Sequence, residues 1–416
     1  MKKYKKMKMA FLGLFTAFCL ISYGADWPQW RGTDRQGKSD ETKLLKKWPE
    51  EGPKLLWSAE GIGQGHSSIS IADGMVYVTG NIDKVEHLTA FDLKGSRKWQ
   101  KPYGKAWNRS HPPARSCATI DSGKAYVISG MGVMSCFDAK TGEEKWTKDA
   151  FTEYDGQYGK WGIAESPLIV DNKVIFTPGG EKATMVALEK DTGEVVWASK
   201  SIGDKPAYCS PTAIERGGKT IIITVVAGHI IGVNAADGEI LWSYACSQYQ
   251  PKVKGINTNT PLYHDGEIFV TSGYDMGSVK LEVSDDGTSV KNKWINYDLD
   301  THVGGVVYVD GYVYGTSWDG NKMGNWICVD WKTGETVYDT EWNNKGQIIS
   351  AEGMLYCYEE KKGNLALVKA DPKGFQVVSS FKIDKGKGVH WAHPAISDGV
   401  LYVRHEDALM AYDIKE

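Results

Sequence analysis

The amino-acid sequence predicts an all-β fold, an eight-bladed β-propeller with four-stranded blades, on three observations. A hairpin-like stretch that ends in tryptophan, CFDAKTGEEKW at Cys136–Trp146, recurs along the chain. An acidic-Gly turn followed by an apolar strand occurs eight times, alternating with those stretches. The composition agrees, because 47 glycines and 16 tryptophans in 416 residues suit a protein of many strands and tight turns.

The hairpin stretch has an apolar pair, an acidic residue, a glycine turn and a terminal aromatic residue. Glycine supplies the positive φ that a tight turn between two strands needs. Close versions are ALEKDTGEVVW at Ala187–Trp197, VNAADGEILW at Val233–Trp242 and CVDWKTGETVY at Cys328–Tyr338. We expect each copy to close one blade with its aromatic residue; in chain order these are Trp99, Trp146, Trp197, Trp242, Trp294, Trp342 (or Tyr338) and the degenerate Phe381.

The eight acidic-Gly turns set the number of blades. They begin at Asp73, Asp121, Asp171, Glu215, Asp265, Asp310, Glu352 and Asp398, a period of about 42–52 residues. The last copy stops before any closing tryptophan strand. Lys54-Leu55-Leu56-Trp57, just before the first repeat, is the candidate for the missing strand, and it would hide the sheet edges by closing the ring. A seven-bladed ring with an irregular extra module is the alternative.

The first 24 residues have the pattern of a signal peptide. Five lysines precede the apolar stretch Met9–Ile21, which is too short to span a bilayer, and small residues follow it. We expect cleavage after Gly24 and export to the periplasm or the exterior. An uncleaved anchor and a lipoprotein anchor on Cys19 are alternatives. No later stretch is apolar enough to cross a membrane, so a mature chain without a transmembrane segment is expected.

The segment 25–53 is predicted to be an arm packed on the propeller, which itself covers 54–416. The arm begins DWPQWRGTDRQGKSDET and carries Trp27, Trp30 and Trp48, more tryptophan than a disordered tail would have. Without residues 1–24 the chain has 44 basic and 52 acidic side chains, a net charge of −8. That charge argues against a nucleic-acid partner, and a monomer is expected.

Six cysteines remain after Gly24, and most lie in apolar strand patterns. Such cysteines are usually small buried hydrophobic residues, although an exported protein can form disulfides. Cys209–Cys246 and Cys117–Cys136 are the pairs that lie within one repeat. Free buried thiols are the favoured prediction, with these two disulfides as the alternative.

The hairpin resembles the tryptophan-docking repeat of the PQQ-like (quinoprotein-type) β-propellers, over nearly the whole mature chain. The segments Asp26–Gly32, Ala164–Leu168 and Thr177–Gly180 are similar to those of secreted bacterial members. The resemblance implies a propeller fold but no single activity. The superfamily contains quinone-dependent dehydrogenases of alcohols and sugars, and also BamB, the non-catalytic lipoprotein subunit of outer-membrane assembly.

In a propeller, the innermost strands line a central funnel and ligands bind at its mouth. The inner strand should precede each acidic-Gly turn, which directs one mixed set of polar and aromatic side chains toward the axis. The candidate ligand-binding residues are His66, Arg115, Glu165, Tyr208, Asn259, His302, Gln347, Trp391 and His393. Alternatively, these groups hydrogen-bond only to one another and to channel water.

Their chemistry suits a polar ligand. Arg115 could hold an anionic or quinone oxygen, Glu165 and Asn259 could supply oxygens to calcium, and Trp391 or Tyr208 offers a stacking surface. The dehydrogenase resemblance also implies a catalytic Asp and often a vicinal cysteine pair beside PQQ. Neither is found here, so no catalytic residue, resident metal or cofactor is assigned. Glu143-Glu144 and Glu359-Glu360 are expected to be solvated turn charges.

The preferred hypothesis is an exported, non-catalytic propeller that acts as a protein-interaction scaffold or binds a small, sugar-like polar ligand. The first alternative is a PQQ-dependent dehydrogenase of a sugar or alcohol, with PQQ and calcium as cofactors. The second is a carbohydrate-binding propeller, suggested by the aromatic residues Trp107, Trp161 and Trp318, which are expected to be exposed.

Overall fold

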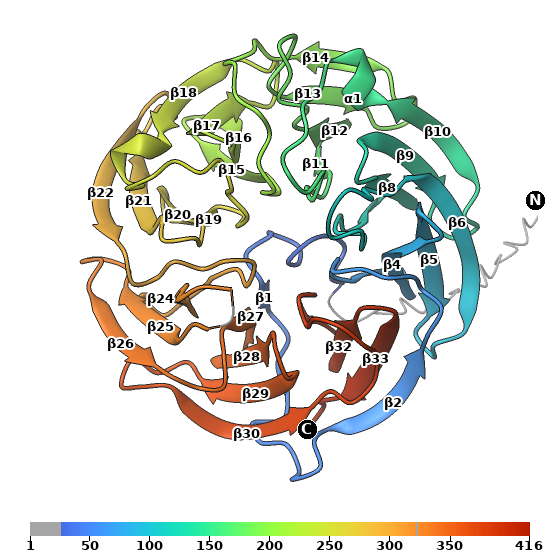
Figure 1. Ribbon diagram of the computed structural model, residues 1–416, viewed down its shortest axis with the longest axis vertical. Helices are drawn as coiled ribbons and strands as arrows, with labels where there is room; N and C mark the ends of the chain where they lie inside the picture. Colours follow the sequence, from blue (N-terminus) through green and yellow to red (C-terminus); the bar gives the residue numbers. More distant parts are fainter. Residues whose placement is uncertain (1–25, 322) are drawn as a thin grey trace, which may run out of the picture.

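The chain forms a closed ring of eight antiparallel sheets, seen down its axis in the computed structural model of Figure 1. The structure describes residues 26–321 and 323–416; the expected signal peptide lies outside them. Each sheet is one blade, with its shortest strand innermost and its fourth strand on the perimeter. The eight-bladed prediction is confirmed, and the seven-bladed alternative is wrong.

The first four blades follow the chain in order, each from the innermost strand outward. Blade 1 consists of β3 (Ser70–Ala72), β4 (Met75–Ile82), β5 (Val85–Asp92) and β6 (Arg97–Lys105). Blade 2 consists of β7 (Thr119–Asp121), β8 (Lys124–Ile128), β9 (Val133–Asp138) and β10 (Glu144–Asp149). Blade 3 consists of β11 (Leu168–Val170), β12 (Lys173–Phe176), β13 (Val186–Glu189) and β14 (Val195–Ala198). Blade 4 consists of β15 (Thr212–Arg216), β16 (Lys219–Val225), β17 (His229–Asn234) and β18 (Ile240–Ala245).

The last four blades include two strands that precede blade 1 in the chain, one of them from the arm. Blade 5 consists of β19 (Leu262–His264), β20 (Glu267–Thr271), β21 (Ser278–Val283) and β22 (Val290–Asn296). Blade 6 consists of β23 (Val307–Val309), β24 (Tyr312–Thr316), β25 (Trp326–Asp330) and β26 (Thr336–Thr340). Blade 7 consists of β27 (Gly346–Ala351), β28 (Met354–Glu359), β29 (Asn364–Lys369) and β30 (Gln376–Lys382), with β1 (Lys38–Ser39) added in parallel inside β27. Blade 8 consists of β31 (Ala395–Ser397), β32 (Val400–His405), β33 (Ala408–Asp413) and β2 (Lys54–Ala59).

Two short helical turns complete the described secondary structure. They are α1 (Ala150–Glu153) and the 3₁₀ turn η1 (Cys246–Gln248). Asp149 caps α1 by accepting a hydrogen bond from the backbone N–H of Thr152. Neither element is long enough to interrupt the ring of blades.

Strand β2 closes the ring, as the sequence predicted. It pairs antiparallel with β33, with Trp57 opposite Ala411. The indole Nε1 of Trp57 donates to the carbonyl of Leu93 in blade 1 at 2.9 Å. One N-terminal strand therefore joins the last blade to the first, which removes the open edge that blade 8 would otherwise present to blade 1.

The other closing tryptophans link neighbouring blades in the same way. Trp146 packs on Tyr126 of its own blade, with ring centroids 6.2 Å apart. Its Nε1 donates to the carbonyl of Lys190 in blade 3 at 3.0 Å. A Cβ added at Gly193 would lie 2.8 Å from the indole, so this turn needs glycine for close approach as well as for its positive φ. A β-bulge precedes the aromatic position in each outer strand.

Blade 7 departs from this pattern. Register places Tyr338 rather than Trp342 at the closing position of blade 6, and Ser379 at the closing position of blade 7. Phe381 lies two residues further along β30 and contacts Gly52 and Tyr412 of the last blade. Trp48 of the arm packs on both Tyr356 and Phe381 (centroids 5.9 and 5.3 Å apart).

Trp48 thus supplies the contact that a blade-7 tryptophan would make within its own blade. In blades 1, 2 and 8, the closing tryptophan packs on the tyrosine of the second strand. Tyr356 occupies that second-strand position in blade 7. The backbone N–H of Trp48 donates to Ser379 Oγ at 2.9 Å, which anchors the arm at the vacant position. The function of one tryptophan is therefore divided between Phe381 and Trp48.

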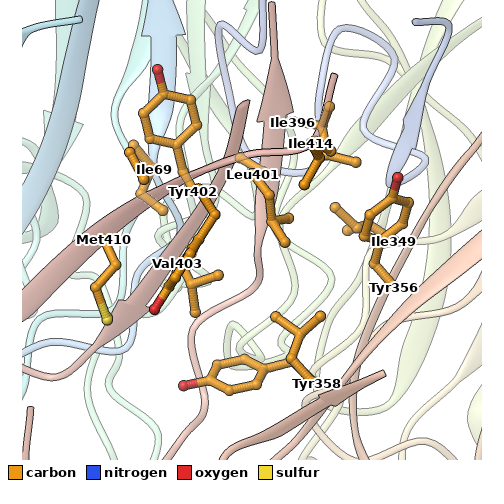
Figure 2. Packing of buried hydrophobic residues seen from close by; sticks show 14 of the residues in the cluster. Ile69, Ile349, Tyr356, Tyr358, Ile396, Leu401, Tyr402, Val403, Met410 and Ile414 are labelled. Carbon is orange, nitrogen blue, oxygen red and sulfur yellow. The ribbon is translucent and has the colours of Figure 1, made fainter. Parts of the chain in front are cut away.

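The core lies mainly between adjacent blades. Figure 2 shows part of the cluster around blades 7 and 8, where Leu401 of blade 8 lies on the side of Ile349 and Tyr356 of blade 7, and Tyr402 points to the opposite side. Trp27, Leu44 and Trp48 of the arm belong to the same cluster. All six cysteines in the described part are unpaired and buried, which confirms the prediction of free thiols over the two disulfides.

Candidate functional site

The two faces of the ring differ because the strands of each blade are antiparallel. One face, here the turn face, carries the turns between first and second strands and between third and fourth strands. The other, here the connector face, carries the loops between second and third strands and the connections from blade to blade. On the turn face, Asp73 and Gly74 both have positive φ, as a two-residue type I′ hairpin requires.

The arm enters the centre of the ring and contacts all eight blades. Trp27 bridges to Ile71 in blade 1, and the carbonyl of Pro28 accepts from Ile120 N in blade 2. Gln36 Oε1 accepts from Tyr263 N in blade 5. A segment that reaches the inner strands of opposite blades must lie on the axis, where Figure 1 shows the arm.

Two arginines of the arm hold blades 3 and 4 and blades 6 to 8. Arg35 donates to the carbonyls of Ser166 (3.2 Å), Pro167 and Pro211 (2.9 Å). Arg31 donates to the carbonyls of Ile348 (3.2 Å) and Val306 and to Nδ1 of His393 (3.0 Å). Burial lowers the pKa of each guanidinium only to about 10, so both stay charged at neutral pH. The axis is therefore filled, at this level, by protein.

Four of the nine predicted site residues lie among these interior contacts and are engaged there. His393 accepts from Arg31 at Nδ1, so its proton is on Nε2, which donates to the carbonyl of Val303 at 2.8 Å. Burial, with the Arg31 charge second, lowers the pKa of His393 to about 3. Gln347, with its amide oriented to donate, bonds the carbonyls of His390 (2.8 Å) and Tyr358 (2.9 Å).

Glu165 and Asn259 are also used by the fold. The carboxyl of Glu165 accepts from the backbone N–H and the hydroxyl of Thr177 at 3.1 and 3.3 Å. Asn259 Nδ2 donates to the carbonyl of Thr301 at 2.6 Å, and its Oδ1 accepts from Gly305 N at 3.0 Å. In these bonds the partners of the four side chains are Arg31, Thr177 and backbone groups, and none of the bonds joins two of the four.

These residues do not fit a calcium ion. Burial raises the pKa of Glu165 to about 8, which leaves the carboxyl protonated at neutral pH, and calcium prefers ionised carboxylates. Asn259 Oδ1 already has a donor, and the neighbouring axis holds Arg31 and Arg35. No group of three or more His, Cys, Asp or Glu within 26–321 and 323–416 could hold a metal ion. A PQQ–calcium centre of the dehydrogenase type is therefore not built from these side chains.

Four of the other five predicted residues, His66, Tyr208, His302 and Trp391, lie on the connector face in a chain of ring contacts around the funnel mouth. Tyr208 contacts Trp161 (centroids 5.3 Å apart), and Trp161 stacks on Tyr274 (6.3 Å). His302 contacts Tyr274 at 4.8 Å and lies 6.1 Å from Trp391. We call the rings in these contacts the mouth aromatics; they are Trp161, Tyr208, Tyr274, His302 and Trp391, together with Trp318 and His66.

His66 is the last ring in this series of contacts, next to blade 1, and it is paired with a carboxylate. Its ring lies 4.9 Å from that of Trp391, and its Nε2 donates to Glu406 Oε1 at 2.9 Å. Burial lowers the pKa of His66, and the hydrogen bond to the Glu406 carboxylate partly offsets that shift. His66 is therefore a positioned hydrogen-bond donor rather than a free base.

Cations flank the mouth aromatics on the side of blades 2 and 3. Arg115 donates through Nη2 to the carbonyl of Trp161, while its Nε has no partner in the described part of the chain. Lys160 Nζ lies 5.3 Å over the Trp161 ring. Neither cation has a carboxylate partner within 4 Å among the described residues. His302 Nδ1 is likewise buried without a partner there.

Three sequence expectations near the mouth are wrong. Trp107 is only 2% exposed and Trp318 only 9% exposed, because neighbouring loops pack over both. Glu359 and Glu360 are buried rather than solvated: Glu359 caps the N–H groups of Lys361 and Lys362, and Glu360 pairs with Lys345 Nζ at 3.0 Å. Lys345 in turn lies 4.9 Å over the Trp318 ring.

Sequence reasoning missed Arg31, Arg35 and Lys345. The two arginines belong to the non-repeating arm, and only their position between buried tryptophans distinguished them. Tyr274 and Trp318 were noted only as members of loops that extend past strand ends. Their side chains meet at a centroid distance of 4.5 Å.

Stability should depend on pH through the buried carboxyl of Glu165. Its folded pKa of about 8 lies above the unfolded value of about 4.3. The folded state therefore binds the proton more tightly, and the free energy of unfolding should fall as pH rises from about 4 through 8. Urea unfolding at pH 5 to 9 should show a flatter dependence for Glu165→Gln than for the wild type. The exposed control Glu144→Gln should keep the wild-type slope; equal slopes for all three proteins would refute the assignment.

Comparisons with known proteins agree with the geometry. Residues 104–340, more than half of the chain, match the sequence family described as "Outer membrane protein assembly factor BamB". The protein of that name from Moranella endobia is 23% identical over 60% of this chain and 63% of its own. A quinoprotein ethanol dehydrogenase from Pseudomonas putida is 26% identical over 74% of this chain and 53% of its own. The chain thus matches less than two thirds of the length of these relatives.

Solved structures share the fold at low identity. BamB from Moraxella catarrhalis superposes with a TM-score of 0.62 at 16% identity, covering 87% of this chain and 98% of that one. Quinohemoprotein alcohol dehydrogenase from Comamonas testosteroni superposes with a TM-score of 0.68 at 14% identity, covering 94% and 81%. None of the helices in the described part of the chain has the length and apolar character of a membrane span.

Proposed function

Because the chain belongs to the family described as outer membrane protein assembly factor BamB, and because its funnel mouth gathers aromatic rings beside two cations, we propose that it is a non-catalytic binding protein. Its ligand is a small, sugar-like polar molecule held on the connector face. The observation that carries the proposal is the continuous chain of ring contacts from Tyr208 to His66.

The mouth aromatics suit such a ligand because a sugar ring has apolar faces and a polar edge. Indole and phenol rings supply a large apolar contact surface together with a polar group at the edge. Trp161, Tyr274 and Trp391 are partly exposed, so their rings are available to a ligand. Arg115 and Lys160 lie where they can donate a hydrogen bond to an anionic or hydroxyl oxygen of the ligand.

The filled axis supports binding rather than quinone-dependent oxidation. In this chain Glu165, Asn259 and Gln347 are bonded within the fold, and Arg31 and Arg35 occupy the axis beside them. The site that remains is the mouth, where the residues that the structure describes form no pair of nucleophile and base. We also propose export of the chain, on the strength of its lysine-rich, apolar N-terminus.

Calorimetric titration with a panel of sugars and sugar acids tests the proposal. Trp391→Ala should weaken binding of the best ligand by about tenfold or more, because it removes a stacking surface worth roughly 1–3 kcal/mol. Trp161→Ala should act similarly. Val196→Ala, an exposed substitution on the perimeter strand β14, is the control and should bind like the wild type.

Two results would contradict the proposal. Failure of every sugar and sugar acid to bind would leave no ligand of the proposed class. Dye-linked oxidation of a sugar or alcohol after addition of PQQ and Ca²⁺ would make the chain an enzyme instead.

A protein-interaction scaffold is the second candidate, favoured by the family match. Leu55 and Leu56 on β2 and Val377 and Val378 on β30 are exposed on neighbouring perimeter strands. If a protein partner binds there, Leu56→Glu with Val378→Glu should abolish its cross-linking in cells while Trp391→Ala leaves it intact.

A further inference from the structure

We propose that the cavity between blades 8 and 1 on the connector face is a second binding subsite, for hydroxyl-rich sugar units joined to the unit at the mouth. The inference rests on the proposed function and extends it: the ligand is an oligosaccharide rather than a single sugar. The cavity's volume is about 960 Å³, at the upper end of the roughly 300–1,000 Å³ of small-molecule sites.

The lining of this cavity carries several polar side chains that complement the aromatic mouth. It includes the carboxylates Glu60, Asp83 and Glu406 and the amides Gln64, Asn81 and Asn108. No aromatic side chain among the described residues lines it. Carboxylates accept hydrogen bonds, and amides both donate and accept them, so this lining suits the hydroxyl groups at the edge of a sugar rather than its apolar faces.

Two acceptor atoms of lining residues lack donors. Asn81 Oδ1 and Glu406 Oε2 are buried with no hydrogen-bond partner in the described part of the chain. A buried acceptor without a donor costs free energy. A ligand hydroxyl is a donor, and its arrival would relieve that cost.

The cavity and the mouth share a wall. Glu406, which lines the cavity, accepts from His66 at 2.9 Å, and the His66 ring lies 4.9 Å from Trp391 of the mouth aromatics. Pro112 also lines the cavity, and its neighbour His111 lies 6.1 Å from the Trp391 ring. A linear ligand that stacks on Trp391 therefore needs to pass only the His66 side chain to enter the cavity.

The floor of the cavity is fixed before any ligand arrives. Asp407 accepts from the backbone N–H groups of Gly61 (3.2 Å) and Gly63 (2.5 Å). Arg404, which is fully buried, donates to the carbonyls of Gly63 at 3.0 Å and Thr79 at 2.6 Å. A preformed site binds its ligand without the entropic cost of ordering loops.

Chain-length dependence of affinity tests the inference. Cello-, manno-, xylo- and galacturono-oligosaccharides of one to five units are titrated calorimetrically into the full chain. In the series that binds, affinity should rise at least tenfold between one unit and four. Asn108→Trp, which fills the cavity from an exposed lining position, should abolish that rise. Lys101→Trp, on the perimeter strand of the same blade, should keep it.

A second variant keeps the test valid if Asn108→Trp does not fold. Glu60→Gln combined with Asp83→Asn keeps the shape of the lining and removes two charges; it should reduce the rise severalfold while thermal unfolding stays near that of the wild type. Affinity that is flat with chain length, or a rise that survives in Asn108→Trp, would overturn the subsite and leave the mouth proposal standing. Absence of binding in every series would overturn both.

Discussion

Trp146→Ala is expected to lower the free energy of unfolding by about 3–5 kcal/mol, the range for truncating a buried tryptophan. The indole is only 8% exposed and fills the space between blades 2 and 3. Its removal leaves a cavity beside Tyr126 and deprives the carbonyl of Lys190 of its donor. Both changes weaken the contact between two blades. The variant should therefore unfold at a lower urea concentration than the wild type.

Glu144→Ala is the matched control for this prediction. Glu144 lies two residues away on the same strand, is exposed and makes no contact between blades. Its replacement should change the free energy of unfolding by less than about 0.5 kcal/mol. If the two variants unfold at the same urea concentration, Trp146 does not link the blades as described.

Trp48→Ala should cost nearly as much, about 3–5 kcal/mol, although Trp48 belongs to no blade. The side chain is 2% exposed and packs on Tyr356 and Phe381. Its loss opens the vacant closing position of blade 7 to water. Leu56→Ala, a truncation of an exposed arm-region residue on β2, should change stability by less than about 1 kcal/mol.

A rescue variant separates this role from general damage to the arm. Ser379 occupies the register position at which blades 1 to 5 carry tryptophan. Ser379→Trp should therefore restore part of the stability lost in Trp48→Ala, and it should destabilise the wild type, where Trp48 already fills the space. If Ser379→Trp has the same effect in both backgrounds, the two side chains do not share one position.

Most of the ring was predictable because its determinants repeat. Asp73 and its equivalents, Trp146 and its equivalents, and the orphan strand around Trp57 each occur in a pattern that only a closed ring satisfies. The site was less predictable because side chains that do not repeat decide it. The repeat pattern directed Glu165 and His393 toward the axis, but it could not show that Arg31 and Arg35 lie there too.

The sequence pattern also did not predict burial of a charged side chain whose partner is distant in sequence. Glu360 resembled a solvated turn residue because nothing near it in sequence neutralises it. Its partner Lys345 lies 15 positions earlier, on the loop that leads into the same blade. Trp107 is covered by residues distant in sequence as well: Tyr158 and Gly162, which contact it, lie in the connection from blade 2 to blade 3.

The position of the arm on the axis also determines the order of the folding steps. Arg31 is synthesised 362 positions before its partner His393. Loops of that length close slowly, and a ribosome releases the N-terminus long before blade 8 exists. Residues 26–53 must therefore wait until the last strand is made and then seat as the final piece. A circular permutant that begins at blade 1 and carries this segment at its C-terminus should complete the ring sooner, since the arm would then follow its partners.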